Sequence, residues 1–300
     1  MSDLTSKDKS LSQESSLNRL GRLTTHEQRG LLVAPFLSGR GLEFGAGIAP
    51  QRLRPDTECI YFDKRSRSEL AALFKVEESV VPPVEHFEAL PDLFPNGADF
   101  LIAHHVLEHL SNPIGALVQW LSWLKEESLL VLSFPEAKCC LDRERLIPPL
   151  EHLLLDYFLV RDDNSFESRE HIFSFILGWR EAGVRKNMDA TQLTANCFHC
   201  AKMEHNDLHW HAYNHALAAD LIRSSLIFAG RGGLFELIAY PNHPDENLRT
   251  SLDLLFVVRL VRQSRIFDTN LTEEERSLRS KLAQFRERIA KILARFPCMK

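Results

Sequence analysis

The sequence predicts an α/β fold built on a doubly wound, mostly parallel sheet with an antiparallel closing hairpin. Short apolar runs bounded by turn or polar residues recur at residues 41–44, 59–62, 99–103 and 129–134. Helix-compatible stretches lie between them at residues 67–74 and 113–124. Continuous apolar strands that alternate with helices are typical of a parallel sheet covered on both faces.

The composition suits one large α/β domain with additions. The chain has 300 residues, of which 44% are hydrophobic, so it can bury a substantial core. Its net charge of −5 provides no broad cationic field, and we therefore expect no nucleic-acid partner. No apolar run approaches the roughly 18 residues of a membrane span, and the polar N-terminus lacks a signal-peptide pattern. We expect a cytoplasmic protein without a membrane span.

The first two thirds of the chain divide into three predicted segments. Residues 1–16 are polar and form a predicted disordered tail, because they offer little apolar surface to bury. Residues 17–135 form the core and begin with a helix at residues 17–33 that ends before Pro35. Residues 136–211 are mostly helical in pattern and rich in His, Arg and acidic residues. They form a predicted insertion that would select the substrate.

The remaining residues complete the sheet and add a helix. Residues 212–265 form the end of the core sheet, with a helix at 212–229 and two strands at 234–240 and 254–261. Residues 271–297 form a predicted C-terminal amphipathic helix with a capping box at its start and one apolar stripe. That stripe would pack on its own domain, or pair with a second copy or another partner.

A glycine-rich turn directly follows the first predicted strand in the run LEFGAGIAP. Gly45 and Gly47 allow a tight bend and a close approach of the backbone, including Ala46, to a ligand. We expect the next helix to direct its N-terminal N–H groups to the same place. Pro50 occupies the third glycine position of the dinucleotide fingerprint GxGxxG, which disfavours a nicotinamide oxidoreductase. Glu43 gives the turn a different, acidic-x-Gly-x-Gly pattern.

Asp63 ends the second predicted strand in the run CIYFD. A carboxylate there can accept both hydroxyl protons of a ribose, although it could instead cap the next helix. His86 and Phe87 lie where the adenine pocket of a nucleoside cofactor would form. Phe87 could pack on the adenine, or the segment could be a plain loop.

Two further runs carry a family resemblance. Residues 98–113, ADFLIAHHVLEHLSNP, resemble the FDxIxxxHVLEHxxNP segment of bacterial class I S-adenosylmethionine-dependent methyltransferases. Residues 142–157 resemble the DRxRPxxxxEHLLxDY segment of a branch often met in surface-polysaccharide gene neighbourhoods. The resemblance covers roughly residues 40–160 well and reaches weakly to about 260. Residues 125–128, KEES, depart from the usual Lys-Pro-Gly-Gly, and His86 replaces a common Asp.

The resemblance implies a Rossmann-like fold, S-adenosylmethionine as cofactor and methyl transfer to a polar acceptor. A sugar hydroxyl of surface-polysaccharide or related biosynthesis is the acceptor that the branch suggests. The alternative is a catalytically inactive binding or scaffold protein that keeps the methyltransferase fold. The implied cofactor-binding residues are Glu43, Gly45, Ala46, Gly47, Asp63, His86, Phe87 and His104.

The end of the fourth predicted strand carries the candidate catalytic residues. If a helix starts near His105, the i, i+3, i+4 spacing places His105, Glu108 and His109 on one face. One histidine, polarised by the carboxylate, could be a general base. The same three residues could bind a divalent cation, or they could only pack the helix and line the cofactor site.

The predicted insertion and the start of its helices supply candidate substrate-binding residues. Arg143 and Arg145 could hold a phosphate or carboxylate, or could form surface ion pairs. His152 and Tyr157 would lie on the same side, facing a small-molecule or saccharide acceptor. Cys197 and Cys200 have zinc-knuckle spacing, but a lone CxxC lacks a second ligand pair, so no metal site is predicted.

Overall fold

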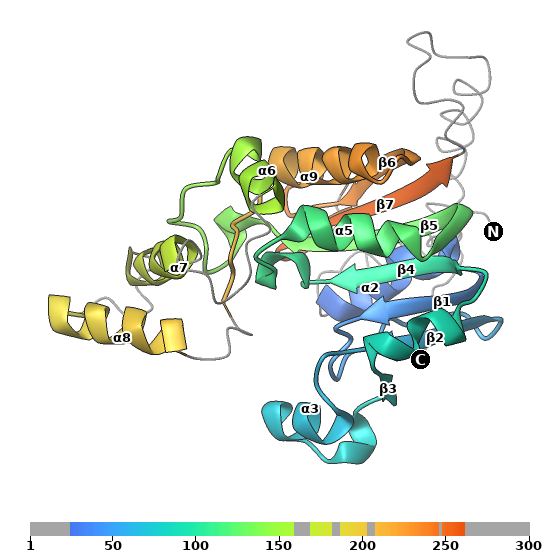
Figure 1. The fold of residues 1–300 in the computed structure, drawn as a ribbon, viewed down its shortest axis with the longest axis horizontal. Helices are drawn as coiled ribbons and strands as arrows, with labels where there is room; N and C mark the ends of the chain where they lie inside the picture. Colours follow the sequence, from blue (N-terminus) through green and yellow to red (C-terminus); the bar gives the residue numbers. More distant parts are fainter. Residues whose placement is uncertain (1–24, 159–168, 182–186, 203–207, 246–247, 262–300) are drawn as a thin grey trace, which may run out of the picture.

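In the computed structural model, one sheet organises the described residues, which are 25–158, 169–181, 187–202, 208–245 and 248–261. Its seven strands follow the order β3-β2-β1-β4-β5-β7-β6 (Figure 1). The strands are β1 (Gly39–Phe44), β2 (Thr57–Phe62), β3 (Val84–Glu85), β4 (Ala98–His104), β5 (Leu124–Pro135), β6 (Gly232–Ala239) and β7 (Asp253–Val261). The predicted N-terminal tail and C-terminal helix lie outside the described residues.

Strand directions define a Rossmann-like α/β fold. β3, β2, β1, β4 and β5 are mutually parallel. β7 runs antiparallel to β5 and to β6, so β6 and β7 form an antiparallel hairpin at the sheet edge. The predicted doubly wound, mostly parallel sheet with an antiparallel closing hairpin is therefore confirmed. The departure at residues 125–128 lies within β5, where Glu127 adopts a φ of 61° and the pairing with β4 shifts register between Leu124 and Leu129.

Local sequence signals explain where several helices begin. Ser66 and Glu69 form a reciprocal capping box at the start of α3. Asn112 caps α5 through the Gly115 amide, and Pro113 takes the first helical position. The helices are α2 (Thr25–Val33), α3 (Arg67–Phe74), α4 (Leu90–Leu93), α5 (Pro113–Ser122), α6 (Leu150–Phe158), α7 (Arg169–Glu181), α8 (Ala190–Lys202) and α9 (His215–Phe228).

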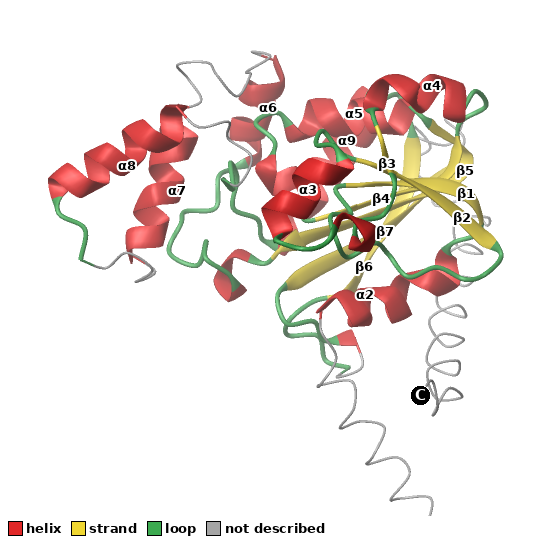
Figure 2. Cartoon of the chain, turned by 90° about the horizontal axis from the view of Figure 1, so that it is seen from below, coloured by secondary structure: helices red, strands yellow, loops and turns green. Residues whose placement is uncertain are grey.

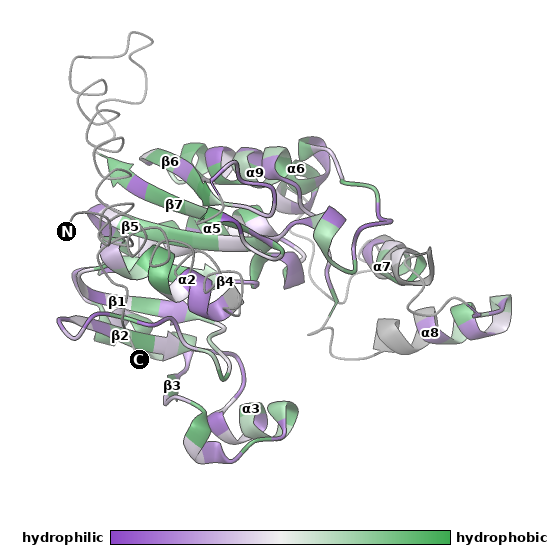
Figure 3. Ribbon diagram, turned by 180° about the vertical axis from the view of Figure 1, so that it is seen from behind, coloured by the Kyte–Doolittle hydropathy of each residue, from purple (hydrophilic) through white to green (hydrophobic). Residues whose placement is uncertain are grey.

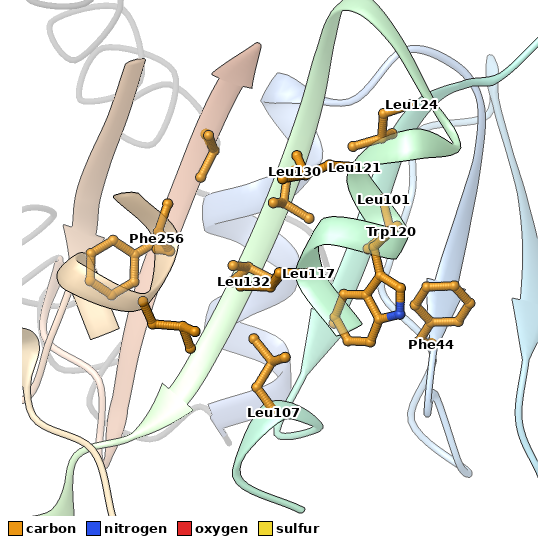
Figure 4. Packing of buried hydrophobic residues seen from close by; sticks show 14 of the residues in the cluster. Phe44, Leu101, Leu107, Leu117, Trp120, Leu121, Leu124, Leu130, Leu132 and Phe256 are labelled. Atoms are coloured by element: carbon orange, nitrogen blue, oxygen red, sulfur yellow. The ribbon is translucent and has the colours of Figure 1, made fainter. Parts of the chain in front are cut away.

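The two faces of the sheet are covered unequally. α5 and α9 pack on one face, where Leu117 and Leu121 meet Leu130 and Leu132 of β5 in the larger apolar core (Figure 4). In Figure 2, α2 lies on the opposite side of the sheet from α4, α5 and α9. Figure 3 shows hydrophobic residues gathered on the strands and on α5 and α9, whereas α8 is mixed. None of the helices in the described ranges is long and apolar enough to cross a membrane.

The connection between β1 and β2 corrects one prediction. We expected a helix after the glycine turn, but residues 45–56, all of them described, contain no helix. Pro50 and Pro55 interrupt this short connection, and each removes a backbone donor. α2, which precedes β1, supplies cover for this face through Leu32 and Val33. The glycine turn is therefore not followed by a helix, and no helix N-terminus directs its N–H groups toward the turn from residues 45–56.

Candidate active site

The site lies where the carboxyl ends of β1, β2 and β4 meet. Phe44, Phe62 and Ala103 are in register, so the residues that follow each strand come together at one edge. This edge is the topological switch point of an open α/β sheet, where ligands commonly bind. In Figure 1 the arrowheads of β1 and β4 point to the side of the molecule on which α7 and α8 lie.

The glycine turn after β1 depends on both of its glycines. Gly45 and Gly47 have φ angles of 66° and 55°, in the left-handed region that favours glycine. A Cβ on Gly45 would lie 2.9 Å from Cγ2 of Val106, and Gly45 itself is exposed. Ala46 and Gly47 are buried. At Gly45 the turn therefore exposes backbone atoms that no side chain covers, so a ligand could approach them closely.

The buried Glu43 side chain lies beneath the glycine turn and is hydrogen-bonded to the end of the loop that follows it. Its Oε2 accepts a hydrogen bond of 2.9 Å from the backbone N–H of Gln51, and the residue is buried. Burial raises the pKa of Glu43 to about 8, against the opposing effects of the Gln51 N–H and the Arg29 charge. Glu43 therefore shapes the turn from within the protein and does not face the solvent.

Glu43→Gln should flatten the pH dependence of the free energy of unfolding. The native carboxyl keeps its proton up to about pH 8, whereas the unfolded carboxyl loses it near its ordinary pKa of 4.5. The native state binds more protons between these values, so wild-type stability should fall by up to a few kcal/mol as pH rises through this window. The variant lacks this fall, and its stability relative to wild type should increase with pH.

Chemical denaturation at both ends of the window measures this difference. The matched control is Glu58→Gln, because Glu58 lies on the neighbouring strand with a side chain that is 62% exposed. This control gives the effect of removing an exposed carboxylate from the same sheet at each pH value. Parallel curves for wild type and Glu43→Gln would mean that Glu43 ionises normally in the native protein.

Asp63, His86 and Phe87 border the other side of this edge. Oδ1 of Asp63 accepts a 2.9 Å hydrogen bond from the Arg65 N–H, an arrangement that holds the carboxylate at the end of β2. Phe87 is 40% exposed, and its ring contacts the terminal β1 and β2 rings, Phe44 and Phe62, at centroid distances of 5.3 Å and 6.2 Å. His86 is exposed beside it.

His104 is held inside the site by two hydrogen bonds. Its Nε2 lies 3.0 Å from Oε1 of Gln51, and its Nδ1 lies 3.0 Å from Oγ of Ser133. The amide oxygen can only accept, so Nε2 carries the proton and Nδ1 accepts from the hydroxyl. Burial, followed by the Arg29 charge, holds the pKa of His104 well below its usual range. His104 is neutral and ties the glycine loop to β5.

His105 forms a pair with an acidic residue that sequence reasoning missed. Its Nε2 lies 2.6 Å from Oδ1 of Asp253, the buried first residue of β7. Its Nδ1 lies 3.8 Å from Oε1 of Glu108, and 31% of the His105 side chain is exposed. Burial opposes protonation of His105, but the hydrogen bond to Asp253 and the charges of Glu108 and Asp253 outweigh it and raise the pKa.

The backbone of His105 is unusual as well. Its φ is 54°, and its N–H donates to the Ser133 carbonyl at 3.1 Å. Positive φ is uncommon outside glycine and often marks a functional position. This conformation ends β4 and turns the imidazole toward β7. Arg29 lies on the far side of Asp253, with Nε 3.3 Å from Oδ2.

No helix starts near His105, so the helix-face spacing considered for His105, Glu108 and His109 does not apply. Only a 3₁₀ turn, η4 (Leu107–His109), forms there, because α5 cannot begin before its cap at Asn112. Glu108 is fully buried, and neither carboxylate oxygen has a hydrogen-bond partner within the described part of the chain. His109 donates through Nδ1 to the Leu208 carbonyl at 3.1 Å. Glu108 and His109 lie with His209, their potential ligand atoms all within 4.8 Å.

The two candidate arginines occupy different environments. Arg143 is exposed near Glu144, with Nε 3.8 Å from Oε1. Arg145 is buried and donates to Asp142 at 2.8 Å and to the carbonyls of His209 and Trp210 at 2.8 Å and 3.1 Å. Arg145 thus organises the chain beside η4, whereas Arg143 is the arginine presented to solvent.

The other two candidate substrate residues lie on α6 and face different neighbours. Nε2 of His152 is 2.8 Å from Nε2 of His171 on α7. Tyr157 stacks on Phe228 of α9, with ring centroids 4.7 Å apart. The four predicted substrate-binding residues therefore do not gather into one patch.

Comparisons with known proteins find similarity only at the level of fold. No protein-family profile matches the chain, and no curated protein matches it. The CurJ carbon methyltransferase structure is 14% identical, with a TM-score of 0.36, 76% of this chain covered and 50% of that one. The citrinin polyketide synthase CMeT domain is 13% identical, with a TM-score of 0.37 and coverages of 74% and 46%.

A third solved structure is matched over most of its length. The plantazolicin methyltransferase BpumL, in complex with a triazolic desmethylPZN analog and SAH, is 11% identical, with a TM-score of 0.41. The match covers 86% of this chain and 93% of that chain. By contrast, the present chain spans about half the length of the CurJ and citrinin synthase chains.

Proposed function

We propose that the protein is an S-adenosylmethionine-dependent methyltransferase that acts on a polar acceptor. The observation that carries the proposal is the meeting of three features at one strand edge. They are the bare glycine turn after β1, the Asp63 carboxylate after β2 and the His105–Asp253 pair after β4. The first two features suit a nucleoside that carries a ribose, and the third suits removal of a proton.

The turn also favours this cofactor over a dinucleotide. A dinucleotide places its pyrophosphate on the N-terminus of the helix after the glycine turn. Residues 45–56 provide no such helix. S-adenosylmethionine carries a ribose and an adenine but no phosphate, so it needs none. Gly45, Asp63 and Phe87 would hold its methionine, ribose and adenine portions in that order along the edge.

His105 is the proposed general base. Bound S-adenosylmethionine would supply an electrophilic methyl group, and the acceptor hydroxyl must lose its proton as it attacks. With Nε2–H donated to Asp253, Nδ1 of His105 has the lone pair that takes this proton. Asp253 fixes the ring and stabilises its charged form, and Glu108 adds a second negative charge near Nδ1.

The acceptor class is proposed to be a saccharide hydroxyl, with the exposed Arg143 contacting an anionic part of the acceptor. The test is a screen with radiolabelled S-adenosylmethionine over sugar, lipid, protein and nucleic-acid fractions. Label should enter the saccharide fraction, and Arg143→Ala should raise the acceptor KM while cofactor affinity stays unchanged. Label in another fraction would overturn the acceptor class. Tight cofactor binding without transfer to any fraction would favour the scaffold alternative.

A further inference from the structure

A second cluster of histidines lies outside the proposed active site. His152 and Asp156 are one turn apart on α6, His171 is on α7, and His211 precedes α9. We name these four residues the histidine cluster. Their potential ligand atoms all lie within 4.8 Å of one another. Three separate segments of the chain therefore direct nitrogen and oxygen atoms to one point.

The distances within the histidine cluster match a four-ligand metal centre. Nε2 of His211 lies 2.9 Å from Oδ2 of Asp156, and Nε2 of His171 lies 3.5 Å from it. Nε2 of His152 lies 3.6 Å from the same oxygen and 2.8 Å from Nε2 of His171. Ligand atoms around a tetrahedral zinc ion are roughly 3.3 Å apart, given bonds of about 2.0–2.1 Å. The separations of 2.8 Å and 2.9 Å are shorter than this value, and those of 3.5 Å and 3.6 Å are longer.

Burying the polar side chains of the histidine cluster costs free energy, which a bound cation would offset. The side chains of Asp156 and His211 are 0% exposed, and that of His171 is 3% exposed. Two neutral imidazoles facing each other through Nε2, as in His152 and His171, can share only one proton. A cation would instead use every converging lone pair at once.

We propose that the histidine cluster binds a divalent transition-metal ion, with zinc as the preferred ion. Three imidazole nitrogens and one carboxylate oxygen form a donor set that zinc accepts in tetrahedral geometry. Four protein ligands from a largely buried site leave no open position for a substrate. The ion therefore has a structural role and joins α6, α7 and the segment before α9.

This ion would also brace the active-site edge. The segment that carries His211 donates the Trp210 N–H to the Glu108 carbonyl at 2.6 Å. The same segment supplies the Leu208 carbonyl that accepts from His109. Fixing His211 thus fixes the strip of chain that covers Glu108 and His109. The metal site stands on its own geometry and does not depend on the proposed methyl transfer.

The first experiment measures metal in the purified 300-residue chain. Elemental analysis should find a single zinc ion per chain, and the protein stripped by a chelator should unfold at a lower temperature and recover with zinc alone. Cobalt added to the stripped protein should give the intense visible absorption of a tetrahedral site. A wild-type protein that neither contains zinc nor binds added zinc or cobalt would overturn the proposal without any variant.

The second experiment locates the ion. His171→Ala and His152→Ala should each weaken zinc affinity by on the order of a hundredfold or more, and the partly exposed His152 is the milder change. The controls are His209→Ala, in the neighbouring group with Glu108 and His109, and the double variant Cys197→Ser/Cys200→Ser. Both controls should keep the wild-type zinc content. Zinc lost in either control but retained in the two cluster variants would overturn the assignment.

Discussion

Replacement of His105 by alanine should lower the turnover number of the proposed methyl transfer by about a hundredfold or more. The reason is geometric, because His105 combines an exposed ring edge with an Nε2 that is held 2.6 Å from Asp253. S-adenosylmethionine affinity should stay nearly unchanged, since neither nitrogen is needed to form the glycine turn. Steady-state kinetics and calorimetry on the same variant separate the two effects.

The pH dependence of the rate gives this prediction a sharper form. A general base works in its neutral form, so the rate should rise with pH through the raised pKa of His105 and then level off. Asp253→Asn removes a charge that raises this pKa, so the midpoint should move to lower pH and the maximal rate should fall. His105→Ala should abolish this ionisation from the profile.

A matched control and an alternative mechanism complete the test. His215→Ala changes an exposed histidine in the first turn of α9 and should leave rate and profile unchanged. If a divalent cation at Glu108 and His109 drives the reaction instead, Glu108→Ala and His109→Ala should each abolish activity although the ion of the histidine cluster is retained. Full activity in His105→Ala, Glu108→Ala and His109→Ala would leave these residues only a packing role.

The sheet was predictable because its signals are local. The apolar runs at residues 41–44, 59–62 and 99–103 each match a parallel strand, and the helix predicted at residues 67–74 matches α3. These elements are specified by short patterns of burial and capping that operate within a few residues. The helix expected after Gly47 did not form because Pro50 and Pro55 interrupt that connection, and α2, from before β1, covers the face instead.

The site was predictable only where a strand end and a sequence pattern coincide. Asp253 is 148 residues from His105, and no local pattern links them. One signal was present, since an antiparallel closing strand must bring its own N-terminal end to the carboxyl edge of its parallel neighbours. Pro135 and Asp253 are indeed in register. The histidine cluster depends on a contact between His152 on α6 and His171 on α7, which residue spacing does not specify.

Gly45→Asp should weaken S-adenosylmethionine binding by a hundredfold or more, which corresponds to about 2.7 kcal/mol. An aspartate at φ 66° is strained by roughly 1–2 kcal/mol, its Cβ would lie 2.9 Å from Val106, and its carboxylate would repel the cofactor carboxylate. Asp63→Ala should cost about 1–3 kcal/mol, the scale of lost hydrogen bonds to a charged group. Gly230→Ala, a positive-φ position at the end of α9, controls for backbone strain and should bind normally. Calorimetry on folded proteins measures all three, and an unchanged affinity in Gly45→Asp would remove the cofactor from this edge.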